Sequence, residues 1–241
     1  MNAVGYISSV QSMGTLDGPG VRFVAFLQGC NLRCGCCHNP ETQEMLGGME
    51  YTADALVEKV LRYKSYFGKD GGITLSGGEP LLQADFSAQV FSKCKEAGIN
   101  TCLDTSGSIL NDDVKKLLAV TDRVLLDIKY HTDSLYREYA GCSLQKPIEF
   151  LSYLNSEGIA TTVRQVIIPQ LNGNDDDVEF LKDIIKSYTC IDKIELLPFK
   201  KICKSKYDNL ERCFPFENYD TPTAECVKKL QAEVEKGFCE R

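Results

Sequence analysis

A stretch of thirteen residues, QGCNLRCGCCHNP, constrains this 241-residue chain more than any other part of it. Four of the thirteen residues are cysteines, Cys30, Cys34, Cys36 and Cys37. A disulfide framework is a poor explanation, because adjacent cysteines such as Cys36 and Cys37 cannot pair without strain. Dense thiolates behind a hydrophobic strand instead indicate ligation of a soft metal, either zinc or an iron–sulfur cluster.

The number of nearby ligands helps to separate these two metals. Zinc usually takes four protein ligands, commonly from two separated pairs. The other eight cysteines of the chain stand singly, with no second C-x2-C among them. A single local set of three thiolates favours a 4Fe-4S cluster in which one iron has no protein thiolate. A zinc-stabilised binding module without catalysis is the alternative from a different functional class.

Charge and cysteine content exclude several other classes. The net charge is −7 and the pI is about 5.0, which argues against nonspecific nucleic-acid binding. No apolar run approaches the roughly 18 residues that a membrane span needs. The first residues, MNAVGYISSV, show no signal peptide. Twelve cysteines in a chain with no visible export signal predict a reducing cytoplasm.

Hydrophobic stretches alternate with helical patterns along the chain, which predicts a parallel sheet with helical crossovers. About six such strands are expected, whereas a closed barrel has eight. The predicted fold class is therefore α/β, a partial (β/α)6 TIM-like barrel. We expect one domain over residues 1–241. Residues 1–20 hold a short strand over 5–10 and a loop over 11–20, and a C-terminal extension spans about 201–241. The strands are expected near 23–27, 73–75, 99–103, 123–126, 160–168 and 193–197, and the last helix near Pro222.

Polar residues stand just past the expected strand ends: Cys30, Glu79, Asp104, Asp127 and Lys200. Barrel enzymes place their chemistry at these carboxyl ends. This edge of the sheet is therefore the predicted site.

The spacing C-x3-C-x2-C of Cys30, Cys34 and Cys37 resembles the cluster motif of the radical S-adenosylmethionine superfamily. The resemblance implies one 4Fe-4S cluster, whose open iron takes the amino and carboxylate groups of S-adenosylmethionine. Cys36 stands where this family usually has an aromatic residue. That departure leaves open whether Cys36 replaces Cys37 as the third ligand.

The segment Ser76-Gly77-Gly78-Glu79-Pro80 follows a predicted strand. Paired glycines let the backbone approach a ligand closely, although a plain turn is the simpler explanation on local chemistry alone. Behind a cysteine loop the segment resembles the GGE motif of the same superfamily, which contacts the amino group of S-adenosylmethionine. The resemblance therefore implies that Gly77, Gly78 and Glu79 bind this cofactor.

A second signature narrows the family. Residues 17–22 read DGPGVR and, with Gly29-Cys30, resemble the signature of glycyl-radical-enzyme activating enzymes. Similar matches continue to about Lys201. Activators of several other glycyl radical enzymes carry a cysteine-rich insert, which the chain lacks between Cys37 and Ser76. The resemblance therefore implies pyruvate formate-lyase as the partner, with another glycyl radical protein or a small molecule as the alternative substrate.

The resemblance also implies a reaction. An external donor, reduced flavodoxin or ferredoxin, supplies one electron, and S-adenosylmethionine is cleaved to a 5′-deoxyadenosyl radical. This radical removes a hydrogen atom from a glycine of the partner, so no acid–base residue is needed. Asp17 is expected to help hold the partner's glycine segment. We expect a monomer, with neither nucleic acid nor membrane as a partner.

Further site residues follow from the family. Buried carboxylates such as Asp104 and Asp127 need a cation or a hydrogen-bond partner. Ordinary hydrogen bonds would satisfy that need, whereas the resemblance implies a monovalent cation held by both, with backbone oxygens of Thr105 and Leu125. At Lys200 the family usually has histidine, and lysine cannot stack or accept a hydrogen bond. The implied contacts to S-adenosylmethionine outside the GGE motif are Cys36, Cys37, His38, Asp127, Ile128, Lys129, Arg164 and Lys200.

Overall fold

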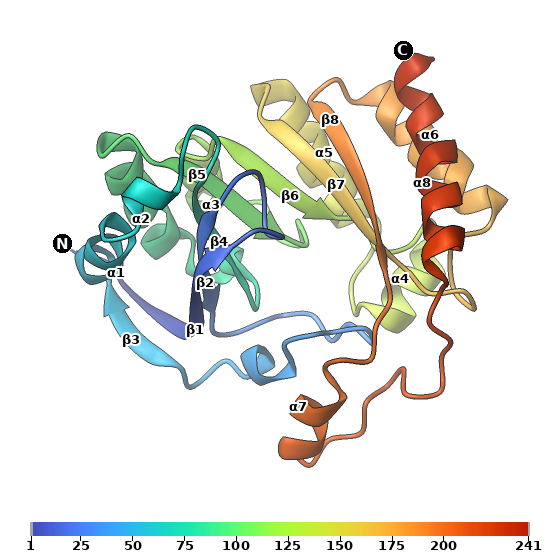
Figure 1. The fold of residues 1–241 in the computed structure, drawn as a ribbon, viewed down its shortest axis with the longest axis horizontal. Helices are drawn as coiled ribbons and strands as arrows, with labels where there is room; N and C mark the ends of the chain where they lie inside the picture. Colours follow the sequence, from blue (N-terminus) through green and yellow to red (C-terminus); the bar gives the residue numbers. More distant parts are fainter. Residues whose placement is uncertain (1, 241) are drawn as a thin grey trace. The chain divides into compact units, whose positions relative to one another are not determined.

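The computed structural model describes residues 2–240 and has an α/β fold (Figure 1). Its strands form one sheet in the order β3-β1-β2-β4-β5-β6-β7-β8. The chain divides into two compact units, one built from Met1–Asn31 and Glu41–Leu125, the other from Leu32–Pro40 and Leu126–Arg241. The cysteine-rich stretch is divided accordingly, with Cys30 in the first unit and the other three cysteines in the second.

The first unit holds the antiparallel and the first parallel strands. β1 (Val4–Gly14) pairs antiparallel with both β2 (Arg22–Leu27) and β3 (Met49–Thr52). β2, β4 (Gly72–Gly77) and β5 (Asn100–Thr105) are parallel neighbours. β6 (Arg123–Asp127) crosses the boundary between the units. The helices are α1 (Ala53–Leu61), α2 (Ala84–Glu96), α3 (Asp112–Leu118) and three short turns, η1 (Pro40–Gln43), η2 (Lys64–Tyr66) and η3 (Pro80–Gln83).

Hydrophobic sequence explains the core of this unit. Five of the six residues of β2, RFVAFL, are buried, as parallel strands covered on both faces should be. Leu27, at the end of β2, is in register with Gly77, at the end of β4. The carboxyl ends of these strands therefore meet at one edge of the sheet.

The second unit contains a parallel pair of strands, β7 (Ala160–Ile167) and β8 (Ile191–Pro198). A capping box of Asn174 and Asp177 starts α6, and α8 packs against α6, side by side in Figure 1. The helices are α4 (Asp133–Tyr139), α5 (Gln145–Glu157), α6 (Asp175–Ser187), α7 (Lys204–Asn209) and α8 (Ala224–Cys239).

The α/β class is confirmed, and β2, β4, β5, β6, β7 and β8 follow one another in the order that the sequence predicts. Several boundaries were wrong. β1 continues to Gly14, where a loop was expected from residue 11. β3, α4 and α7 were not predicted, because each is short and buries at most one side chain. The last helix begins at Ala224 with Thr223 as its N-cap, so Pro222 precedes the cap and does not open the helix.

Within residues 2–240, no helix combines the length and the apolar character that crossing a membrane requires. The expectation of a single domain stays a prediction.

Candidate active site

The glycine-rich loop after β4 lies against the turn that leads into the first cysteine. The backbone N–H of Gly78 donates to the carbonyl of Leu27 over 2.9 Å, and that of Glu79 donates to Gly29 over 2.8 Å. A Cβ at Gly78 would lie 2.1 Å from the Gly29 oxygen. Gly77 has a φ of 103°, and its Cβ would lie 2.5 Å from the Leu27 nitrogen. Only glycine allows this close approach of the two loops.

Glu79 is buried and fully hydrogen-bonded. Its Oε1 accepts from the Thr105 hydroxyl at 2.6 Å and from the Leu81 N–H at 3.2 Å. Its Oε2 accepts from the N–H and the hydroxyl of Ser106. Burial raises the pKa of the Glu79 carboxyl, and these hydrogen bonds oppose the shift only in part. The side chain therefore fixes the loop after β5 beside the glycine-rich loop.

Asp104 stands on one face of β5, where its Oδ2 accepts from the Ser76 hydroxyl at 2.6 Å. Thr74 precedes Ser76 by two residues, so both side chains lie on the same face. The hydroxyl of Thr74 donates to the backbone carbonyl of Asp17 over 2.7 Å. The DGPG loop therefore folds onto the face of the sheet that carries Asp104. Along the strands, its contact at Thr74 is two residues, or roughly 7 Å, from the contact of Asp104 at Ser76.

Arg22, the last residue of the DGPGVR stretch, anchors this loop. Its guanidinium is buried, and every acceptor that it contacts is neutral. One nitrogen donates to the carbonyl of Pro19 at 3.0 Å, inside the loop. The other contacts tie it to the beginnings of β4 and β5: the Thr74 hydroxyl, the carbonyls of Asp70, Ile73 and Asn100, and the Asn100 side chain.

In the second unit, the rest of the cysteine loop packs on the end of α4. The Gly35 N–H donates to the carbonyl of Tyr139 at 2.9 Å. The Cys37 N–H donates to the carbonyl of Cys34 at 3.1 Å, which closes a turn between these two cysteines. Both are partly exposed, as is Cys30 in the first unit. The three cysteines of the C-x3-C-x2-C set are thus all partly accessible.

Cys36 differs from these three cysteines. Its side chain lies in an apolar cluster, and burial raises the pKa of its thiol to about 11, so it keeps its proton at neutral pH. Beside it, a Cβ on Gly35 would lie 2.4 Å from the ring of Phe216. The buried members of the cluster besides Cys36 are Ile168, Phe199, Cys203, Tyr207, Phe214 and Phe216.

The segment after β8 is tied to the same loop. The His38 Nε2–H donates to the carbonyl of Lys200 at 3.1 Å, and burial lowers the pKa of this histidine. The Lys206 ammonium donates to the Asn39 Oδ1 at 2.9 Å. The sequence alone did not predict that residues 201–219 cover the cysteine loop. Their aromatic residues, Tyr207, Phe214, Phe216 and Tyr219, were the available signal.

A charged network stands at the end of β6. The Asp127 carboxylate accepts from the Lys129 ammonium at 2.9 Å and from the Arg164 Nε at 3.2 Å. Burial would raise the pKa of Asp127, but these two cations outweigh it and lower the pKa. The Ile128 N–H donates to the carbonyl of Arg164 at 2.9 Å. The structure thus brings together the four predicted residues Asp127, Ile128, Lys129 and Arg164.

The four predicted cation ligands belong to both units, with Asp127 in the second and the other three, Asp104, Thr105 and Leu125, in the first. Among residues 2–240, no three His, Cys, Asp or Glu side chains converge on a point that would suit one metal ion. A 4Fe-4S cluster does not need three side chains that converge on one point, because each thiolate binds a different iron.

A pocket of about 500 Å³ lies in the first unit beside Gly29. Its walls come from β1, from Met45 and from the segment that joins η3 to α2. Gly77, Gly78, Glu79 and Asp104 are not among its lining residues, so it is separate from the predicted cofactor contacts.

Comparison with known proteins agrees with these motifs. Residues 24–184 match the Radical SAM superfamily. The chain is 41% identical to the pyruvate formate-lyase-activating enzyme of Clostridium pasteurianum, over 95% of this chain and 96% of that protein. It is 36% identical to pyruvate formate-lyase 1-activating enzyme of Escherichia coli (strain K12), over 98% of this chain and 97% of that protein.

The fold resembles that of Streptococcus suis SuiB bound to S-adenosylmethionine, with a TM-score of 0.67 and 18% identity, over 88% of this chain and 46% of that one. Because identity at this level shows the fold alone, the family rests on the sequence matches. The chain belongs to the radical SAM superfamily and, within it, to the family of pyruvate formate-lyase-activating enzymes.

Proposed function

We propose that this protein activates pyruvate formate-lyase by generating a glycyl radical on it with S-adenosylmethionine. The observation that carries the proposal is the joining of two motifs: backbone hydrogen bonds hold the glycine-rich loop against the turn that leads into the cysteine motif. Relatives that share more than a third of their residues over almost the whole chain carry this activity in their names.

The donor set suits a 4Fe-4S cluster. Cys30, Cys34 and Cys37 are partly exposed, whereas Cys36 is buried among aromatic rings as a protonated thiol. We therefore assign the first three as ligands, and three local thiolates leave one iron for the cofactor. When bound, the cluster and S-adenosylmethionine supply the radical chemistry that removes a hydrogen atom from the partner's glycine.

The remaining cofactor contacts are proposed from the same geometry. Gly77 and Gly78 expose backbone groups at the edge where β2 and β4 end, and Glu79 holds that loop in shape. Lys129 and Arg164 hold Asp127 as a carboxylate, which supports the Asp127–Lys129 stretch as the binding segment for the nucleoside. Cys36 and His38 contribute from the cysteine loop, and Lys200 contributes from the segment after β8, which His38 ties to that loop by a hydrogen bond. A monovalent cation would take Asp104, Thr105, Leu125 and Asp127.

Asp17 is the proposed contact to the partner's glycine segment. Thr74 and Arg22 hold its loop through the backbone carbonyls of Asp17 and Pro19. We expect Asp17→Ala to slow glycyl radical formation more than it slows cleavage of S-adenosylmethionine without the partner. Equal loss of both activities would show that the loop serves the cofactor site.

The setting of the reaction is also proposed. Reduced flavodoxin or ferredoxin would supply the electron. From the cysteine content, the protein would work in the cytoplasm, and we expect it to act as a monomer.

Electron paramagnetic resonance tests the function directly. The anaerobically reconstituted protein is incubated with pyruvate formate-lyase, S-adenosylmethionine and dithionite, and the spectrum is read for a glycyl radical. We expect a radical that depends on all components and is lost with Cys37→Ala. A radical on a different glycyl radical enzyme, with none on pyruvate formate-lyase, would move the assignment to that partner.

A further inference from the structure

The segment that covers the cysteine loop has an unusual charge. Residues 200–206 read KKICKSK, with four lysines among seven residues. Residues 200–212 hold five basic and two acidic residues, which leaves 27 − 5 = 22 basic and 34 − 2 = 32 acidic residues elsewhere. The segment is therefore a basic patch, with a net charge of +3, in a chain whose remainder has a net charge of −10.

This basic segment is fixed to the cysteine loop at both of its ends. Lys200 accepts from His38 through its backbone carbonyl, and Lys206 donates to Asn39. His38 and Asn39 directly follow Cys37, a proposed cluster ligand. The basic segment is thus held within a few residues of Cys37, at the proposed cluster that receives the electron.

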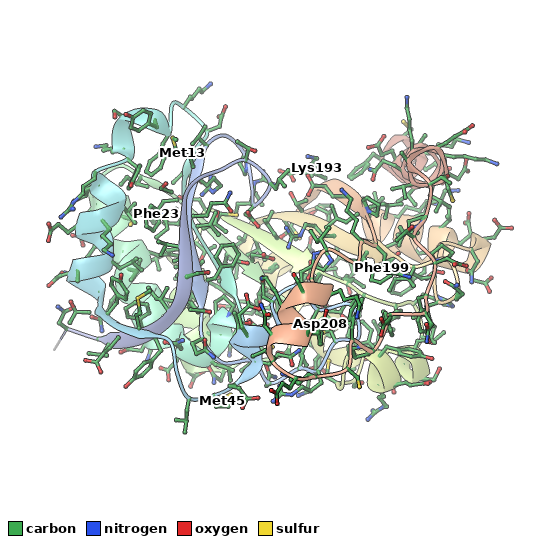
Figure 2. The ribbon with its side chains drawn as sticks, turned by 60° about the horizontal axis from the view of Figure 1, so that its bottom comes forward. Met13, Phe23, Met45, Lys193, Phe199 and Asp208 are labelled. Carbon is green, nitrogen blue, oxygen red and sulfur yellow. The ribbon has the colours of Figure 1, made fainter. Side chains whose placement is uncertain are left out.

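Buried residues hold the segment while its polar side chains lie outside. Cys203 and Tyr207 are part of the apolar cluster. Between them, Lys204 keeps 45% of its side chain exposed and pairs with Glu217 and with Asp208, and Asp208 is labelled on α7 in Figure 2. Ile202 is 72% exposed in the middle of the lysines. An exposed apolar residue with lysines beside it along the chain is a common composition for a protein docking site.

We propose that residues 200–206 form the docking surface for an acidic one-electron donor protein. The proposal rests on the function proposed above, because this chain needs such a donor only if it holds the proposed cluster. One electron leaves the reduced donor and enters the cluster, and no proton or group moves. Complementary charge steers the encounter, whereas the acidic remainder of the chain repels an acidic donor.

A second exposed surface near the cysteine motif fits this donor less well. Met45 and Leu46 are 58% and 89% exposed and follow the loop in the first unit, and Met45 is labelled in Figure 2. Their charged neighbours along the chain are Glu41, Glu44 and Glu50. This surface is apolar but acidic, so it serves as the comparison surface.

The test compares two reductants in the glycyl radical assay. Reduced flavodoxin must dock, whereas dithionite reaches the cluster without a docking surface. Ile202→Glu and the double variant Lys201→Gln/Lys204→Gln change the proposed surface and leave His38, Asn39 and Lys200 in place. Leu46→Glu and Lys228→Gln/Lys229→Gln are the matched controls, the first at the comparison surface and the second on exposed lysines of α8.

We expect both test variants to raise the KM for flavodoxin about fivefold or more, with the rate under dithionite unchanged and the controls like wild type. The flavodoxin-driven rate of the wild type should also fall as salt is added. An unchanged KM in both test variants, an equal loss with both reductants, or a larger effect of Leu46→Glu would overturn the proposal. Absence of any radical in the wild type with dithionite would instead contradict the proposed function.

Discussion

Two carboxylates near strand ends, Glu79 buried and Asp127 partly buried, are stabilised in opposite ways. Glu79 in the first unit is surrounded by neutral donors, the hydroxyls of Thr105 and Ser106 and two backbone N–H groups. Asp127 in the second unit is surrounded by the cations of Lys129 and Arg164. Burial raises the pKa of Glu79, whereas the two cations lower that of Asp127.

The difference indicates two roles. Both oxygens of the Glu79 side chain already accept hydrogen bonds from the protein, so its loop offers a ligand mainly backbone groups. The Asp127 network keeps formal charges together, which suits the proposed binding of a charged cofactor there. A preformed polar loop and a preformed ionic network are both ways of fixing a site before its ligand binds.

The largest effect is expected for Asp127→Asn. Removing this charge takes away the carboxylate to which both Lys129 and Arg164 donate, which costs about 3–5 kcal/mol of unfolding free energy. Urea unfolding of the protein at pH 7 measures it. Glu58→Gln is the control, because Glu58 is exposed and its pair with Arg62 should be worth less than about 1 kcal/mol. A loss below about 1 kcal/mol for Asp127→Asn would show that the ionic network is not a structural unit.

Glu79→Gln should cost less, about 1–3 kcal/mol. The amide keeps the shape of the side chain, but its NH₂ group must face one of the N–H donors of Leu81 or Ser106. The same unfolding experiment checks the order of the two variants. If Glu79→Gln is the more destabilising, the neutral network is the stronger of the two, and the comparison is reversed.

The smallest expected effect is the pH dependence of the stability lost in these two variants. The loss of unfolding free energy should change with pH in opposite directions for Glu79→Gln and Asp127→Asn. The pKa of Glu79 is raised in the folded state. Its contribution to the free energy of unfolding is therefore fully present below the ordinary pKa of 4.5 and is lost as pH rises through the folded pKa. Asp127 has a lowered pKa, so its stability is present above 3.8 and is lost as pH falls through the folded pKa. The advantage of wild type over Glu79→Gln should shrink with rising pH, and that over Asp127→Asn should grow. Parallel slopes would refute the contrast.

The sequence predicted those features of the fold that depend on local patterns of residues. Strand periodicity predicted β2 and β4 to β8 in order, and the resemblance to the family implied the residues around Asp127 that the structure brings together. The covering of the cysteine loop by Phe214 and Phe216 could not be predicted, because it depends on packing between residues about 180 positions apart. For the same reason, the sequence alone left the choice between Cys36 and Cys37 open, and the burial of Cys36 supports the proposal of Cys37.

The position of Cys36 also shows how a departure from the family pattern is accommodated. An aromatic residue is usual there, and in this chain the small thiol belongs to the same apolar cluster as the rings of Phe199, Phe214 and Phe216. A bulky substitution such as Cys36→Tyr would overpack this cluster at a cost of about 1–3 kcal/mol. Cys36→Ala is therefore the cleaner variant for asking whether this thiol binds metal.

Iron and sulfide content of the anaerobically purified protein tests the central claim most directly. We predict about four irons per chain in the wild type and in Cys36→Ala, and loss of the cluster in Cys30→Ala, Cys34→Ala and Cys37→Ala. Zinc without iron in the wild type, or iron lost from Cys36→Ala and kept in Cys37→Ala, would contradict the account.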